Sequence, residues 1–219
     1  MPAHLIRELD RLRRRLLSLG TRVEAAIAKS VMAMVRRDGR LAEEVVEADE
    51  EIDRMEVEVE EECLKLLALY QPVAGDLRFI VAALKINNDL ERMGDLAVNI
   101  AKGAARLAAR ERVEVPADLG AMAAKTRSMV KRSLDALVNA DLALAQKVCA
   151  DDDEVDAFRH SLRARMQAAI ADAPEQSESI LTLFMAVGHL ERIADIATNI
   201  AEDVIYTVEG KIIRHGGSV

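Results

Sequence analysis

The sequence has no tryptophan, two tyrosines and three phenylalanines among 219 residues, and it contains only four prolines and ten glycines. A β-sandwich or β-barrel needs frequent turn residues and strands rich in aromatic side chains, so this composition excludes both. Apolar residues nevertheless make up 51% of the chain, which is enough to form a sizeable core. Alanine, leucine, valine, glutamate and arginine dominate, as is typical of long packed helices.

Other absences restrict the class of protein. The only two cysteines, Cys63 and Cys149, have no paired metal-binding spacing, which indicates small buried residues in a reducing compartment. The N-terminus lacks the apolar segment of a signal peptide, and no run of about 18 apolar residues predicts a membrane span, so a cytoplasmic protein is expected. A net charge of −8 disfavours a general nucleic-acid or anionic-lipid surface.

Apolar residues near the start of the chain recur at alternating spacings of four and three, the heptad pattern of a helix with one packed face. They are Leu5, Leu9, Leu12, Leu16, Leu19, Val23 and Ala26. Asp38-Gly39 ends this helix, and Asp76 is the expected N-cap of the third helix along the chain. The predicted helices cover roughly 5–37, 40–70, 77–110, 117–139, 141–171 and 178–209.

The second half of the chain repeats the first. Segment 42–53, AEEVVEADEEID, resembles segment 145–156, AQKVCADDDEVD, and residues 89–104 resemble residues 189–204. A three-helix unit has therefore been duplicated. The predicted fold is all-α, with two tandem antiparallel three-helix bundles in residues 1–112 and 113–219, joined at a linker near residues 111–118.

Each half carries two acidic pairs at i, i+4 spacing, which stacks both side chains on one face of a helix. The pairs are Asp49 with Asp53, Glu91 with Asp95, Asp152 with Asp156, and Glu191 with Asp195. In the first half the two pairs lie symmetrically about Pro72, and in the second half symmetrically about the Ala173–Pro174 bond. If each half folds back at that turn, four carboxylates come level on adjacent helices.

Four neighbouring carboxylates require a cation or shared protons, and a ligand set made only of oxygens suits Mg, Mn, Ca or Fe. The alternative is a solvated groove in which these acids pair with Arg54, Arg92 and Arg192. A metal-dependent phosphohydrolase and a metal buffer would use the same carboxylates. The D-D-x-x-D match at 152–156 is not kept in its own duplicate at 49–53, which argues against an isoprenoid synthase.

The doubled motif DLERMGDLAVNIA and HLERIADIATNIA, in a duplicated helical chain, resembles the PhoU family of phosphate-uptake regulators, as does the ending at 208–217. The resemblance implies a cytoplasmic, non-enzymatic negative regulator of phosphate uptake and of the phosphate-starvation response. Its implied partners are the ATPase subunit of the high-affinity phosphate ABC transporter and a phosphate-sensing histidine kinase, and it implies a homodimer. No direct binding of nucleic acid and no membrane insertion are expected.

The resemblance also implies metal ligands, because members of this family carry metal ions on paired E(D)-x-x-x-D motifs. Carried over by position, the ligands are Asp49, Asp53, Glu91, Asp95, Asp152, Asp156, Glu191 and Asp195. The implied metal is a divalent or iron-type ion, with Fe, Mn, Mg and Zn as the candidates. Ala194 stands where the family usually has glycine, whereas Gly94 keeps it, so the resemblance leaves the equivalence of the two sites open.

Overall fold

The structure is a computed structural model that describes residues 3–209. Within that range the chain forms six α-helices and one short 3-10 helix, which confirms the predicted all-α class. Their bounds are α1 Ala3–Arg36, α2 Gly39–Tyr70, α3 Ala74–Ala108, α4 Ala117–Asn139, α5 Leu142–Asp172, η1 Pro174–Gln176 and α6 Ser177–Glu209. The part of the family-like ending that follows residue 209 lies outside the described residues.

Side-chain caps explain where the middle helix of each half begins. Asp38 accepts a hydrogen bond from the Leu41 amide, and Asp141 accepts one from the Leu144 amide. The prediction that Asp76 caps α3 is wrong. That helix begins three residues earlier than predicted, with Val73 at the N-cap position and no side-chain cap. Asp76 lies in its first turn, where its negative charge interacts favourably with the positive end of the helix dipole.

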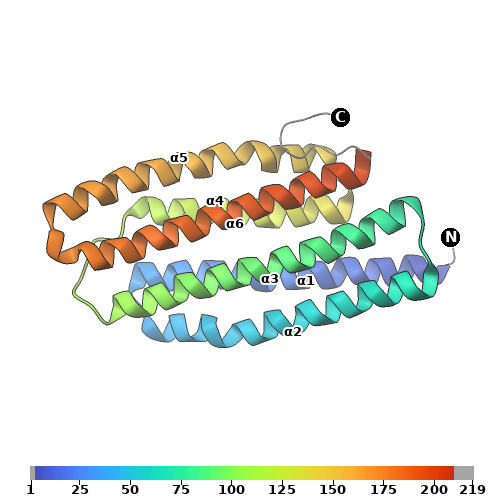
Figure 1. The fold of residues 1–219 in the computed structure, drawn as a ribbon, viewed down its shortest axis with the longest axis horizontal. Coiled ribbons are helices and arrows are strands. Elements are labelled where there is room, and N and C mark those ends of the chain that lie inside the picture. Colours follow the sequence, from blue (N-terminus) through green and yellow to red (C-terminus); the bar gives the residue numbers. More distant parts are fainter. Residues whose placement is uncertain (1–2, 210–219) are drawn as a thin grey trace.

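The two halves form two elongated bundles that lie side by side (Figure 1). Helices α1, α2 and α3 make the first bundle and α4, α5 and α6 make the second, as predicted. Contacts between α1 and α4 and between α3 and α6 join the bundles, so one hydrophobic core continues from one half into the other. All seven heptad residues of α1 belong to this core.

A segment without regular structure, residues 109–116, connects the bundles. It contains the predicted boundary after residue 112, and the division into two domains at that point stays a prediction. Val113 anchors the segment because its side chain is buried in the shared core.

Two features of the described residues bear on the class of protein. No helix within residues 3–209 is both long enough and apolar enough to span a membrane. Cys63 is a buried free thiol whose pKa is raised to about 12, first by burial and then by the nearby charges of Glu62 and Glu60, so it behaves as a small apolar residue.

Candidate functional site

The first carboxylate cluster, defined as Asp49, Asp53, Glu91 and Asp95, lies where α2 and α3 run antiparallel near their midpoints. Burial, and then the charges of Asp53 and Asp95, raise the pKa of Asp49 above its usual value. Burial, followed by Asp95 and Asp53, also raises the pKa of Glu91. The four acids therefore lie close enough to repel one another, in the register that the symmetry about Pro72 predicts.

Gly94 allows the two helices to approach closely at this cluster. A Cβ atom added to Gly94 would lie 3.3 Å from both Asp49 Oδ1 and Ile52 Cγ2. Such a contact is tighter than ordinary van der Waals packing, so the missing side chain brings the α2 carboxylates toward those of α3. At the equivalent position of the second half, Ala194 is fully buried.

A fifth carboxylate, Glu56, extends the first cluster by one helical turn. The buried Asn87 side chain donates hydrogen bonds to Glu56 Oε1, at 3.0 Å, and to the Glu56 carbonyl oxygen, at 2.9 Å. The charge of Glu56 contributes to the raised pKa of Glu91. Glu56 was not among the residues predicted from the sequence, although it follows Asp49 and Asp53 on the same face of α2.

The second carboxylate cluster, defined as Asp152, Asp156, Glu191 and Asp195, occupies the equivalent place on α5 and α6. Burial and then the charges of Asp195 and Asp156 raise the pKa of Asp152. Burial and then Glu191 and Asp156 raise the pKa of Asp195, while Arg159 and Arg192 act to lower it. These four acids are also gathered as predicted.

Arg159 makes the second cluster chemically different from the first. Arg159 Nη1 lies 2.6 Å from Glu191 Oε1, so an internal cation neutralises one of the four carboxylates. When the repeats are aligned, Arg159 occupies the position of Glu56. The first cluster is thus purely acidic, whereas the second already contains a positive charge.

The two clusters meet at a central groove between α3 and α6, with a volume of about 390 Å³. It is lined by Arg92, Asp95, Leu96, Asn99, Arg192, Asp195, Ile196 and Asn199. The motif copies therefore face each other, and the carboxylates form one band across α2, α3, α6 and α5. Arg92 forms an ion pair with Asp89 at 3.0 Å and not with a cluster acid. Among the described residues Arg54 and Arg192 form no ion pair, although the charge of Arg192 acts on Asp195. The alternative in which these three arginines pair with the cluster acids is therefore supported only by Arg192.

The donor set of the first cluster fits a hard cation, because it offers carboxylate oxygens whose mutual repulsion a cation would relieve. The side chains are not arranged as a finished metal site, however. Within residues 3–209, no three His, Cys, Asp or Glu side chains are positioned together to hold a metal ion. Binding would therefore need new rotamers on α2 and α3, which the partial exposure of these side chains permits.

The raised pKa values predict how stability depends on pH. Asp49 and Glu91 hold a proton more tightly in the folded state than at their ordinary pKa values of 3.8 and 4.5. Ionisation of these two groups therefore costs the folded state more than the unfolded chain, and their joint contribution to stability should fall as the pH rises above about 4.5. Burial lowers the pKa of His189, so that residue contributes in the opposite sense. Urea unfolding in the presence of a chelator measures this slope.

The variant Asp49→Asn/Glu91→Gln should flatten the slope and gain about 1 kcal/mol at pH 7, because several like-charge pairs are removed. Glu50→Gln/Glu61→Gln, which neutralises two exposed acids of the same helix, is the matched control and should keep the slope. A stability difference between the wild type and Asp49→Asn/Glu91→Gln that does not change with pH would contradict the assignment.

Ion pairs oppose this trend in more acidic solution. Burial alone would raise the pKa of Asp151, but hydrogen bonds from Lys125 and Arg132 hold it below its usual value. The stability from this contact is present above the ordinary aspartate pKa and is lost as the pH falls through the lowered one.

Comparison with known proteins finds similarity in both halves of the chain. The family model described as "PhoU domain" matches residues 16–104 and again residues 119–204, one match in each half. The chain is 38% identical to the phosphate-specific transport system accessory protein PhoU homolog of Aquifex aeolicus, over 96% of each chain. It is 38% identical to the homolog of the same name from Pseudomonas aeruginosa, over 96% of this chain and 87% of that one.

Solved structures agree with the sequence comparison. The crystal structure of PhoU from Pseudomonas aeruginosa matches with a TM-score of 0.88 and 35% identity, covering 93% of this chain and 98% of that one. The phosphate transport system regulatory protein PhoU from Streptococcus pneumoniae matches with a TM-score of 0.89 and 29% identity, over 95% and 98% of the two chains. With the doubled acidic motif present in both bundles, this chain belongs to the PhoU family.

Proposed function

We propose that this protein restrains phosphate uptake and the phosphate-starvation response as a non-enzymatic adaptor in the cytoplasm. The observation that carries the proposal is the match to PhoU domains in both halves, together with relatives named as phosphate-specific transport system accessory proteins. Membership of that family supports a role in the regulation of phosphate transport. The adaptor would connect the ATPase subunit of a phosphate ABC transporter to a phosphate-sensing histidine kinase, and would do so as a homodimer.

The band formed by the two carboxylate clusters and the central groove is the surface we propose for docking. Its exposed acids and arginines suit contacts with a charged partner, since complementary charge sets orientation and association rate more than affinity. Both motif copies contribute to the band, so a single partner element laid across α3 and α6 would touch equivalent residues from each half.

We further propose that the first carboxylate cluster holds a divalent or iron-type cation, with Asp49, Asp53, Glu91 and Asp95 as ligands. When bound, the cation would partly neutralise the negative charge of the band at this point. Arg159 makes the second cluster the weaker of the two, because Glu191 would have to leave its ion pair to become a ligand.

A partner-retention experiment tests the adaptor. Immobilised full-length protein should retain the transporter ATPase subunit and the kinase cytoplasmic region from the same cell type, with retention that changes between low and high phosphate. Asp53→Asn/Glu91→Gln should weaken retention, whereas Glu50→Gln/Glu61→Gln should not. Failure to retain either partner at both phosphate levels would reject the adaptor.

Elemental analysis tests the metal separately. Protein purified without chelators should carry metal that falls markedly in Glu91→Ala and changes less in Glu191→Ala. Metal content equal to wild type in Glu91→Ala/Glu191→Ala would show that the ligands are elsewhere. Hydrolysis of phosphoesters in the presence of Mn²⁺ or Mg²⁺, lost in Asp95→Ala, would instead indicate an enzyme.

A further inference from the structure

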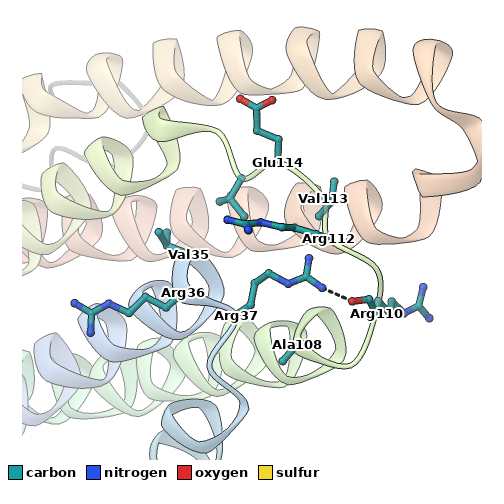
Figure 2. A pocket seen from close by; sticks show the side chains of 9 residues that line it. Val35, Arg36, Arg37, Ala108, Arg110, Arg112, Val113 and Glu114 are labelled. Atoms are coloured by element: carbon teal, nitrogen blue, oxygen red, sulfur yellow. Dashed lines mark hydrogen bonds between the residues drawn. The ribbon is translucent and has the colours of Figure 1, made fainter.

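A second, differently charged pocket lies at the junction of the two bundles, far from the carboxylate band. This linker pocket has a volume of about 780 Å³ and is formed by the end of α1, the end of α3 and the connecting segment (Figure 2). Its lining residues are Val35, Arg36, Arg37, Ala108, Arg110, Arg112, Val113, Glu114 and Val115. The volume falls within the range of small-molecule sites.

The linker pocket concentrates positive charge in a protein whose net charge is −8. Four of its nine lining residues are arginines and one is an acid. Arg110 is engaged by an ion pair with Glu178, but Arg36 and Arg112 are exposed and have no ion pair within residues 3–209. The guanidinium groups of Arg36 and Arg112 are therefore available to a ligand, and Arg37 lies beside them in the lining of the pocket.

Arg37 is held rigidly at the floor of the pocket. Its Nη2 atom donates a hydrogen bond to the carbonyl oxygen of Arg110, just beyond α3 (Figure 2), and another to that of Leu107 in the last turn of α3. Its Nη1 atom is buried and has no hydrogen-bond partner in the described chain. One side of the guanidinium thus fixes its orientation, and the other leaves a desolvated donor unused, which is costly unless something accepts its hydrogen bond.

The duplicate shows that the backbone does not require an arginine here. Arg37 has φ 56°, and the residue at the same place in the second half, Ala140, has φ 51°. In both halves the following aspartate amide bonds back to the helix, Asp38 to Ala33 and Asp141 to Ala136. A glycine would suit this left-handed backbone conformation better than either residue. The two positions therefore differ in the side chain of Arg37 and not in the backbone.

We propose that the linker pocket binds a small anion carrying two or more linked phosphate groups, such as pyrophosphate or the phosphate chain of a nucleotide. Guanidinium groups form paired hydrogen bonds with phosphate oxygens, and two exposed arginines, Arg36 and Arg112, line this cavity beside the anchored Arg37. Because the pocket includes the segment between the bundles, the ligand would contact both that segment and the end of the first bundle. This site is separate from the docking band and does not depend on the adaptor role.

Isothermal titration of the purified full chain with pyrophosphate, ATP and orthophosphate tests the proposal. A chelator is included so that the carboxylate clusters cannot capture a metal–phosphate complex. Saturable binding of pyrophosphate or ATP is expected, at least about tenfold tighter than orthophosphate and weakening with added salt. Binding of ATP alone would still support a phosphate-bearing ligand and would show that the nucleoside contributes.

Arg36→Gln/Arg112→Gln should weaken that binding by at least about tenfold, since the two exposed guanidinium contacts are lost. Both residues are exposed, and circular dichroism verifies that the fold is kept. The matched control is Arg14→Gln/Lys65→Gln, which removes the same charge from exposed positions in the far half of α1 and α2. No saturable binding, or an equal loss in the control pair, would overturn the proposal.

Discussion

Replacing Arg159 with glutamate should strengthen divalent-cation binding at the second carboxylate cluster by at least about tenfold, because a cation is removed from the cluster and an anion is added. The change breaks the 2.6 Å ion pair that now occupies Glu191. It also recreates at α5 the glutamate that Glu56 provides at α2. Titration of Mn²⁺ into protein whose first cluster is disabled by Asp53→Asn/Glu91→Gln isolates the second cluster.

The control for this prediction is Arg165→Glu on the same helix. Arg165 forms an ion pair with Asp118 at 2.7 Å, so the control also breaks an arginine ion pair and alters the net charge equally. It involves no cluster acid and should leave Mn²⁺ affinity nearly unchanged. If both variants strengthen binding equally, general surface charge explains the effect and the two clusters are not distinguished by Arg159.

The sequence contained the signal for Arg159, although it was not used. The alignment of 42–53 with 145–156 extends by three residues to Glu56 and Arg159, where an acid faces a base. The i, i+4 spacing of acidic residues predicts where carboxylates recur. It does not reveal a cation that lies between them. The register of the acidic pairs, by contrast, followed from their symmetry about the turn in each half. Antiparallel helices joined by a short turn bring residues at equal distances from the turn side by side.

Side-chain caps mark the starts of α2 and α5, which the sequence predicted within one residue, and the start of α4 at Ala117 was predicted although no side chain caps it. Asp38 and Asp141 act through local hydrogen bonds, which the sequence encodes directly. The start of α3 at Ala74 has no side-chain cap, so tertiary packing decides it and Asp76 was a misleading choice. A local pattern cannot report a boundary that distant residues set.

The linker pocket had no signal in the sequence. Arg36 and Arg37 lie more than 70 residues from Arg110 and Arg112, and no periodicity connects the two pairs. They meet because the end of α3 returns to the end of α1 (Figure 1). The pairing of α1 with α4 and of α3 with α6 was likewise invisible, since each helix pattern shows that a face is buried but not what buries it.

The contact between the bundles should be highly sensitive to the volume of one side chain. Gly20 lies on α1, and an added Cβ would fall 2.1 Å from Cδ1 of the buried Leu134 on α4. Gly20→Ala should therefore lower the free energy of unfolding by about 1–2 kcal/mol, because overpacking outweighs the gain in helix propensity of about 1 kcal/mol. Urea unfolding at fixed pH measures the change.

Gly188→Ala is the matched control, because an added Cβ in the middle of α6 meets nothing within 4 Å. It should raise the free energy of unfolding by about 1 kcal/mol from helix propensity alone. The opposite signs of the two substitutions separate packing from propensity. If Gly20→Ala is as stable as Gly188→Ala, the prediction is wrong and Leu134 moves aside freely. The contact between the bundles would then be too loose to fix the central groove between the two motif copies.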